Sequence, residues 1–122
     1  MTDNADPSEP SRLETPLSFY GVAAAHGALK AHLFETPLLP SPRLNDFTGA
    51  QVYLKAENIQ RTGSFKVRGA ANKILSLTEK ERDKGVITFS TGNHGKAVAY
   101  VAGRVGLKAV VCLSEHVAAY RA

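Results

Sequence analysis

Apolar and polar residues follow one another along the chain with periods that predict both strands and helices. Residues 52–56 alternate apolar and polar side chains, the pattern of a strand with one face turned inward. From about residue 65 to residue 77 apolar residues recur every three or four positions, which predicts a helix with one buried face. That face consists of Val67, Ala70, Ala71 and Ile74.

The first third of the chain predicts one helix and one irregular segment. An alanine-rich stretch up to about residue 31 is expected to be a helix, with Thr15 as its N-cap and Pro16 at its first position. Prolines at positions 37, 40 and 42 predict an extended loop over 36–45 without regular structure. Residues 46–50 are then expected to turn the chain.

The last third has the pattern of a βαβ unit. Apolar runs at 86–90 and 109–113 predict two buried strands. The segment between them has the apolar stripe of a helix, and Gly106 is expected to end it in the left-handed conformation. This order of elements implies a parallel sheet with a right-handed crossover. The predicted fold class is therefore α/β.

A short charged segment separates the two long helix patterns. Thr78 and Glu81 have the spacing of a capping box, which predicts a helix over 78–84. Its many charged residues are expected to face solvent, and Gly85 is expected to close it.

Composition argues against several classes of protein. Of the 122 residues 43% are hydrophobic, which is enough for about one domain. The net charge is +4, but the 15 basic residues form no run, so nucleic-acid binding is not expected. No stretch has the length and apolarity of a membrane span, and the amino terminus lacks the pattern of a signal peptide. We therefore expect no membrane association and a cytoplasmic location.

Potential metal ligands are scattered along the chain. Cys112 is the only cysteine, so no disulfide can form within the chain, and its apolar surroundings predict a small buried side chain. The four histidines have no spacing that indicates a metal site. No metal is therefore expected.

Lys66 stands at the start of the helix predicted from residue 65. Ser64 is a good N-cap for that helix. The positive end of the helix dipole disfavours an ammonium ion there, and a free amine is what forms an imine with an aldehyde. Lys66 is therefore a candidate Schiff-base lysine, although an ordinary helix lysine would fit the same position. Arg68 is expected to form an ion pair or to lie on the surface.

A second candidate site is the turn between the first strand of the βαβ unit and its helix. Backbone N–H groups in such a turn point outwards at the positive end of the helix dipole, which is typical of an anion site. The spacing matches neither the dinucleotide fingerprint nor the Walker phosphate loop. A purely structural turn is the alternative, with His94 a hydrogen-bonded structural group and not a general base. The turn consists of Ser90, Thr91, Gly92, Asn93, His94 and Gly95.

Both candidates belong to a longer series of motifs. The series runs Thr36-Pro37-Leu38, Val52-Tyr53-Leu54-Lys55, Glu57-Asn58, Gln60, Thr62-Gly63-Ser64-Phe65-Lys66-Val67-Arg68-Gly69-Ala70 and Ser90-Thr91-Gly92-Asn93-His94-Gly95. In order and spacing it resembles the amino-terminal part of the fold-type II pyridoxal-phosphate enzymes, over about residues 34–117. Within that family it is most similar to the serine/threonine dehydratase and serine racemase branch, and there to the dehydratases linked to hydroxyectoine utilisation.

This resemblance implies roles for the residues around Lys66. Lys66 is expected to bind pyridoxal 5'-phosphate through an imine and, once released, to move the α-proton of an amino-acid substrate. Phe65 would lie against the pyridine ring of the cofactor. Asn93 would hydrogen-bond the cofactor's phenolic oxygen.

The resemblance also implies how the substrate is held. The backbone of the turn would bind the substrate carboxylate, through Ser90, Thr91, Gly92, Asn93 and His94. Thr91 stands where racemases of the branch have a serine that acts as the second acid/base. Many dehydratases have no such hydroxyl, so this role of Thr91 stays open.

The implied activity is that of a pyridoxal-phosphate-dependent ammonia-lyase. A hydroxy amino acid such as L-threonine or L-serine would lose its β-hydroxyl group as water and then ammonia, giving a 2-oxo acid. Racemisation and β-replacement on the same fold are the alternatives. A full-length member is expected to form a homo-oligomer.

Composition and the resemblance together predict the organisation of the chain. Residues 1–14 are polar with almost nothing to bury, so they are expected to be a disordered leader. The resemblance implies that 15–77 is the beginning of the large cofactor domain and 85–122 the beginning of a small α/β domain, with 78–84 a connecting helix. The family's glycine-rich phosphate loop and its partner for the pyridine nitrogen have no counterpart in this sequence. We therefore expect a truncated polypeptide. The alternative to an enzyme is an inactive fragment, or an interaction module whose open sheet edge pairs with another chain.

Overall fold

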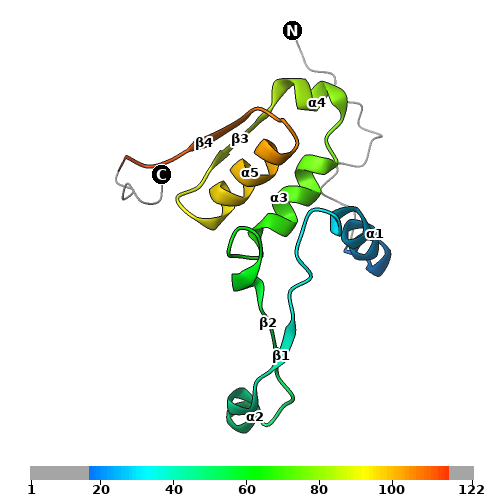
Figure 1. The fold of residues 1–122 in the computed structure, drawn as a ribbon, viewed down its shortest axis with the longest axis vertical. Helices are drawn as coiled ribbons and strands as arrows, with labels where there is room; N and C mark the ends of the chain where they lie inside the picture. The colour runs from blue at the N-terminus through cyan, green and yellow to red at the C-terminus, as the bar shows by residue number, and fades with distance from the viewer. Residues whose placement is uncertain (1–16, 116–122) are drawn as a thin grey trace.

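The computed structural model describes residues 17–115, which form a mixed α/β fold (Figure 1). The predicted leader over 1–14 lies outside these residues. In chain order the elements are α1 (Phe19–Leu29), β1 (Leu38–Pro40), α2 (Pro42–Thr48), β2 (Tyr53–Lys55), the 3₁₀ turn η1 (Glu57–Ile59), α3 (Lys66–Leu75), α4 (Glu79–Lys84), β3 (Val86–Phe89), α5 (Asn93–Arg104) and β4 (Ala109–Cys112). Within the described part of the chain, no helix has the length and apolarity needed to cross a membrane.

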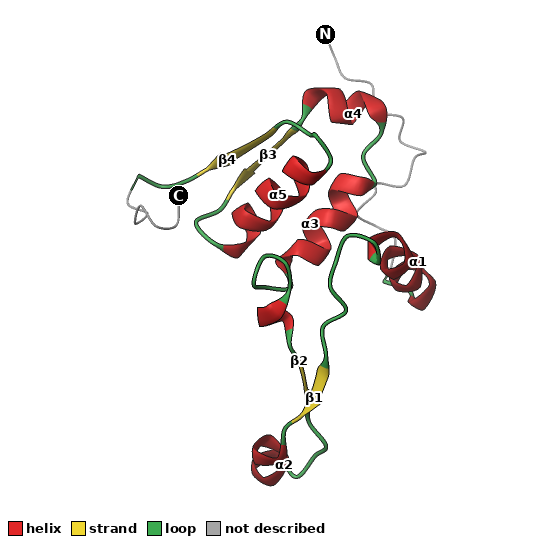
Figure 2. Ribbon diagram, in the orientation of Figure 1, coloured by secondary structure: helices red, strands yellow, loops and turns green. Residues whose placement is uncertain are grey.

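Strands β3 and β4 form a parallel pair with α5 between them, so the predicted βαβ unit is confirmed. The register pairs Val86 with Ala109 and Phe89 with Cys112. Gly106 follows α5 with a φ of 66°, the left-handed conformation that the sequence predicts. Figure 2 shows α5 lying between the strand pair and α3, so the layers are sheet, helix and helix.

The two strands are only half buried, which corrects the prediction of buried strands. Partly buried and exposed residues alternate along both. Ile87 and Phe89 are 73% and 70% exposed. Cys112 is exposed as well, so the prediction that its side chain is buried is wrong. The physical reason is that α5 covers one face of the pair, while no element within 17–115 covers the other.

The core lies between α3 and α5 and includes the predicted apolar face of α3. Seven of the nine buried apolar residues are alanine or valine from these two helices, and such small side chains let the helix backbones approach closely. The buried residues are Leu29, Val67, Ala70, Ala71, Ile74, Ala97, Val98, Val101 and Ala102. Most of the stability of the described fold therefore depends on the contact of one face of α3 with one face of α5.

Side-chain caps determine where α1 and α4 begin. The hydroxyl of Ser18 accepts a hydrogen bond from the backbone N–H of Gly21 at 3.0 Å, and α1 begins at Phe19. The predicted cap, Thr15 and Pro16, lies outside the described residues. Leu17 and Ser18 are not helical, and the observed cap is Ser18, which satisfies a free N–H group of the first turn. In α4 the capping box of Thr78 and Glu81 is confirmed.

Residues 36–50 contain a strand and a helix. The prediction of a loop over 36–45 and a turn over 46–50 is therefore wrong. Strand β1 pairs antiparallel with β2, and α2 follows directly. Pro40 is the last residue of β1, and Pro42 is at the first position of α2, where its missing N–H breaks no helical hydrogen bond. Strand β2 is confirmed, but all its residues are exposed, so the predicted inward face is wrong. The pair projects from the helical body with α2 at its far end (Figure 1).

Replacing Ile74 with alanine should lower the free energy of unfolding by about 2–5 kcal/mol. Ile74 is 2% exposed, so the change leaves a cavity between α3 and α5. Urea denaturation followed by circular dichroism measures the loss. Ile59→Ala is the control, because Ile59 is 54% exposed, and it should cost about 0.5 kcal/mol or less. Equal losses in the two variants would contradict this description of the core.

Candidate active site

The first residues of α3 and α5 lie at the same end of the helix pair. The two helices pack against each other and run in the same direction (Figure 1). Lys66 begins α3, and Asn93 begins α5. The fold therefore brings the candidate lysine and the candidate anion-binding turn, which are far apart in the sequence, to one end of the core.

A tight turn leads the chain into α3. Gly63 has a φ of 75°, and its backbone N–H donates to the carbonyl of Gln60 at 2.7 Å. Phe65, not Ser64, occupies the N-cap position of the helix. The hydroxyl of Ser64 still accepts a long hydrogen bond of 3.4 Å from the N–H of Lys66. The prediction of Ser64 as the N-cap is therefore wrong by one position, although its hydroxyl still accepts a hydrogen bond from the first turn of the helix.

Lys66 and Phe65 present an amine and an aromatic ring side by side. Lys66 is exposed, and its Nζ lies 4.9 Å from the centroid of the Phe65 ring. Phe65 is itself 58% exposed. The amine can therefore be reached by an aldehyde, with an apolar ring beside it against which a flat aromatic group could stack.

The turn before α5 is shorter than predicted. Asn93 and His94 already belong to the helix, so only residues 90–92 connect it to β3. The N–H of Ser90 continues the sheet by donating to the carbonyl of Cys112 at 3.1 Å. Gly92 is the N-cap, and a Cβ added there would meet nothing within 4 Å. Open space thus lies next to the first N–H groups of α5, which have no partner within a helix.

The electrostatics of this end favour an anion. Helix α5 has 12 residues and no acidic residue in its first turn, so the positive end of its dipole is not neutralised from within. Thr91, Gly92, Asn93 and His94 are exposed, and Ser90 is partly buried. Hydroxyl, amide and imidazole groups are therefore available beside the free N–H groups, as a carboxylate ligand requires.

Gly95 allows α5 to approach the sheet closely. A Cβ at this position would lie 2.9 Å from Cγ1 of Val111 and 3.1 Å from the carbonyl oxygen of Ser90. Only glycine fits without a shift of β4 or of the turn. This contact fixes the first turn of α5 relative to the ends of both strands.

An ion pair that sequence reasoning missed lies beside the Lys66 segment. Arg68 donates from Nε and Nη2 to the two carboxylate oxygens of Glu57, at 2.8 and 2.7 Å. The prediction of an ion pair for Arg68 is thus confirmed, but its partner was not identified. The side chain of Glu57 is 14% exposed and that of Arg68 32%. Glu57 stands in one of the motifs, but nothing in its spacing from Arg68 indicates the pairing.

The environment of Glu57 favours the charged carboxylate. The hydrogen bonds from Arg68 lower the pKa of Glu57, although partial burial acts in the opposite direction. A hydrogen bond of 2.5 Å from the hydroxyl of Thr36 lowers it further, and so does the charge of Lys55. The carboxylate in turn raises the pKa of Arg68.

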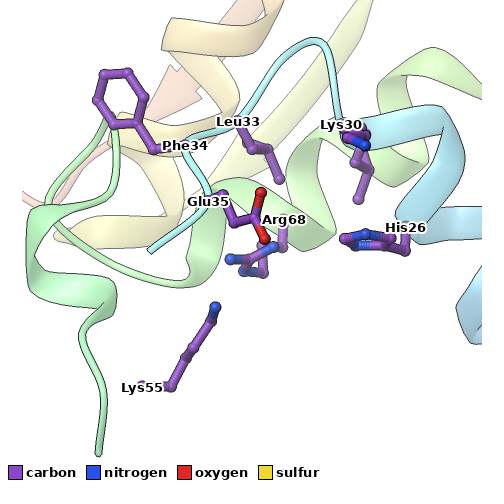
Figure 3. A pocket seen from close by; sticks show the side chains of 8 residues that line it. His26, Lys30, Leu33, Phe34, Glu35, Lys55 and Arg68 are labelled. Atoms are coloured by element: carbon purple, nitrogen blue, oxygen red, sulfur yellow. The ribbon is translucent and has the colours of Figure 1, made fainter. Parts of the chain in front are cut away.

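A cavity of about 190 Å³ lies on the α1 side of Arg68 (Figure 3). Lys55, Glu35 and Arg68 gather around its centre, with His26 and Lys30 from the α1 side. Neither Lys66 nor the turn before α5 lines this cavity. It is therefore separate from the predicted site. Within residues 17–115 no cluster of three potential ligands could hold a metal ion.

The residues at the shared helix end fit pyridoxal 5'-phosphate and an amino acid. Lys66 supplies an accessible amine for the aldehyde, and Phe65 supplies a ring surface. The first N–H groups of α5, which have no partner within a helix, are available for a carboxylate. An aldehyde cofactor and an amino-acid carboxylate can thus be held at the same end of the fold.

Comparison with known proteins agrees with this fold. The sequence model of the family described as pyridoxal-phosphate dependent enzyme matches residues 29–122. The chain therefore belongs to the pyridoxal-phosphate dependent enzyme family, whose cofactor is pyridoxal 5'-phosphate. The resemblance to fold-type II enzymes of the dehydratase and racemase branch is confirmed.

Two of the similar proteins carry names from the dehydratase side of that branch. A Sinorhizobium fredii protein named as a threonine dehydratase is 50% identical over 99 residues, covering 81% of this chain and 30% of its own length. The L-threonine ammonia-lyase of Thermotoga maritima is 43% identical over 95 residues, covering 78% and 24%. The chain thus spans less than a third of the length of these relatives.

A solved structure confirms the fold class. The crystal structure of serine racemase from Dictyostelium discoideum matches with a TM-score of 0.79 and 38% identity, over 86% of this chain and 34% of that one. The α/β architecture of fold-type II enzymes is therefore confirmed. The individual roles of the site residues, the domain boundaries at 77 and 85 and the likeness to hydroxyectoine dehydratases stay predictions.

Gly95→Ala should destabilise the protein by about 1–3 kcal/mol, because the new methyl group overlaps Val111 and the Ser90 carbonyl. Gly103→Ala is a matched control on the same helix. A Cβ at Gly103 meets nothing within 4 Å, so alanine there should be neutral or stabilise by up to about 1 kcal/mol. Urea denaturation of both variants tests the contact, and a stabilising Gly95→Ala would contradict it.

Glu57→Gln should destabilise the protein near neutral pH but not in acid. Because the pKa of Glu57 is lowered in the folded state, its contribution is present above the ordinary pKa of 4.5 and is lost as the pH falls through the folded-state pKa. The difference in melting temperature between wild type and variant should therefore shrink below about pH 4.5. A difference that stays constant into acid would show that the charge of Glu57 contributes nothing.

Proposed function

We propose that this chain carries the lysine end of the active site of a pyridoxal-phosphate-dependent ammonia-lyase. Its substrates are hydroxy amino acids of the L-threonine and L-serine type, and its products are a 2-oxo acid and ammonia. The observation that supports this most directly is the placement of Lys66 and the turn at 90–92 at one end of the α3–α5 pair. The similarity to proteins named threonine dehydratase and L-threonine ammonia-lyase supports the same reaction class.

Bound pyridoxal 5'-phosphate supplies an electron sink for the charge that develops when the α-proton of the substrate leaves. Lys66 Nζ holds the cofactor and, when free, takes up the α-proton. Phe65 limits the movement of the cofactor ring on one side. Asn93, exposed in the first turn of α5, would donate from its amide to the phenolic oxygen of the cofactor.

The turn before α5 orients the substrate. Its N–H groups and the helix dipole bind the carboxylate, through Ser90, Thr91, Gly92, Asn93 and His94. With the carboxylate fixed there, the α-carbon faces the end of the helix pair where Lys66 lies. The exposed hydroxyl of Thr91 is available as a second proton carrier.

Racemisation is a second candidate reaction. Serine racemase of Dictyostelium discoideum is 43% identical over 94 residues, and its crystal structure matches this fold closely. A hydroxyl at Thr91 suits a proton carrier on the face opposite Lys66. Dehydration and racemisation differ in product, so ammonia release and formation of the D-amino acid separate them.

The proposal also covers the assembly of the protein and its location in the cell. Ile87, Phe89 and Val110 leave an apolar surface on the uncovered face of the strand pair, which supports burial of this face against more protein in a homo-oligomer or a longer polypeptide. A role in the metabolism of free amino acids supports a cytoplasmic location. A chain that acts only by association through this surface is the non-enzymatic alternative.

Incubation of the purified protein with pyridoxal phosphate, followed by borohydride reduction and peptide mapping, should label Lys66. Lys66→Ala should remove the label. Lys73→Ala is the control, because Lys73 is an exposed lysine near the other end of the same helix, and it should leave the label in place. Label spread over several lysines, or present at a single lysine other than Lys66, would refute the assignment.

The same variants test the reaction. Ammonia release from L-threonine and L-serine should fall about a hundredfold or more in Lys66→Ala and stay unchanged in Lys73→Ala. A labelled protein that forms D-serine without ammonia is a racemase. A labelled protein that forms neither product is a fragment that holds the cofactor without catalysis, and the proposed activity then belongs to a longer polypeptide.

A further inference from the structure

The loop that leads into Lys66 contains most of the buried polar side chains of the described fold. We define the pre-α3 loop as residues 57–65. Within residues 17–115 four polar residues are buried, and three of them belong to this loop while the fourth lies beside it. They are Gln60, Thr62, Ser64 and Thr36. Burying polar groups is unfavourable unless they are hydrogen-bonded, so this loop requires an explanation beyond hydrophobic packing.

Gln60 joins the pre-α3 loop to the segment before β1. Its side-chain amide donates to the carbonyl of Phe34 at 2.9 Å, and its Oε1 accepts from the N–H of Phe34 at 2.9 Å. The same Oε1 accepts from the N–H of Arg61 at 3.0 Å. The guanidinium of Arg61 lies 4.1 Å from the centroid of the Phe34 ring. Gln60 thus ties the pre-α3 loop to the segment around Phe34.

Glu57 and Arg68 close the loop at its base. Glu57 begins η1 and Arg68 lies in the first turn of α3, so their two hydrogen bonds join the two ends of the loop. Thr36 donates to the same carboxylate, and the carbonyl of Thr36 accepts from Lys55. A two-point contact of this kind needs the planar guanidinium, because a lysine can make only a point contact.

The position of Arg68 is unfavourable for a helix taken by itself. A cation in the first turn opposes the helix dipole, and α3 has no acidic residue in that turn. Glu57 supplies the missing negative charge from outside the helix. The pair therefore places a carboxylate near the start of α3 and ties the loop to it in one contact.

We propose that the Glu57–Arg68 pair, with Thr36 and Gln60, positions Lys66 by holding the pre-α3 loop in a single conformation. This inference rests on the proposed function, in which the Lys66 amine must reach the cofactor and the α-proton. Lys66 directly follows the loop, so a change in the loop moves the start of the helix and the amine with it. Glu57 and Arg68 are thus positioning residues that act through Lys66.

Hydrogen exchange of the purified protein without added cofactor tests the loop directly. The N–H groups of Arg61, Gly63 and Lys66 are hydrogen-bonded within the loop or at its end. In Arg68→Lys they should exchange about tenfold faster, the effect of losing one charge-assisted hydrogen bond. N–H groups in the middle of α5, at Val98 and Val101, should keep their rates.

Three further variants complete the design. Glu57→Gln removes the other partner and should give the same pattern. Thr36→Val removes only one hydrogen bond to Glu57, so it gives a weaker form of the effect should the stronger variants fail to fold. Arg104→Lys is the control, because Arg104 is an exposed arginine in the last turn of α5, and it should change neither set of rates.

A second measurement connects the loop to Lys66. Borohydride trapping after a short exposure to pyridoxal phosphate gives the ratio of label on Lys66 to label on Lys73. This ratio should fall about tenfold in Arg68→Lys, because a mobile loop no longer holds the amine in place. Arg104→Lys should leave it unchanged.

The outcomes separate the two proposals. Faster exchange confined to the loop, with a lower labelling ratio, supports the positioning role. Unchanged exchange in Arg68→Lys and Glu57→Gln overturns it, and so does faster exchange of loop and α5 together, which would show a merely structural pair. If wild-type protein is not labelled at Lys66, the proposed function fails, and the exchange rates alone then decide whether the pair holds the loop.

Discussion

The packing of α3 on α5 is the contact on which the rest of this structure depends. Small side chains on both helices let the two backbones lie close together. The helices run in the same direction, so both begin at one end of the pair. The positive dipole end of α5 and the amine at the start of α3 are thereby brought to one region. Neither helix by itself could hold an amino acid next to a reactive group. Helix α3 supplies only the amine, and α5 supplies only the candidate anion-binding turn.

Different kinds of contact stabilise the core and hold the pre-α3 loop. The helix pair is apolar and buried, whereas the pre-α3 loop is held by hydrogen bonds from Gln60, Thr36 and the Glu57–Arg68 pair. Apolar contacts are not directional, while hydrogen bonds fix angles as well as distances. A loop held in one orientation is what the proposed role of Lys66 requires. The buried hydroxyl of Thr62 has no hydrogen-bond partner within residues 17–115, so it adds nothing to this set of contacts.

One face of the strand pair is apolar and uncovered within the described residues. Ile87, Phe89 and Val110 are exposed there, while the opposite face packs on α5. Parallel strands are usually covered on both faces, so this surface is suited to burial against further protein. The chain spans about 30% of its relative from Sinorhizobium fredii, which agrees with such a surface.

The sequence by itself determined the features that depend on local spacing. The buried face of α3, the capping box at Thr78, the βαβ unit and the family motifs around Lys66 all follow from neighbouring residues and their period. Tertiary structure alone decided the rest. The pairing of β1 with β2 overrode the prolines, the single covering helix left Cys112 exposed, and Glu57 met Arg68 across a loop. These outcomes depend on which distant segment lies alongside, and that is a property of the folded chain that no local pattern contains.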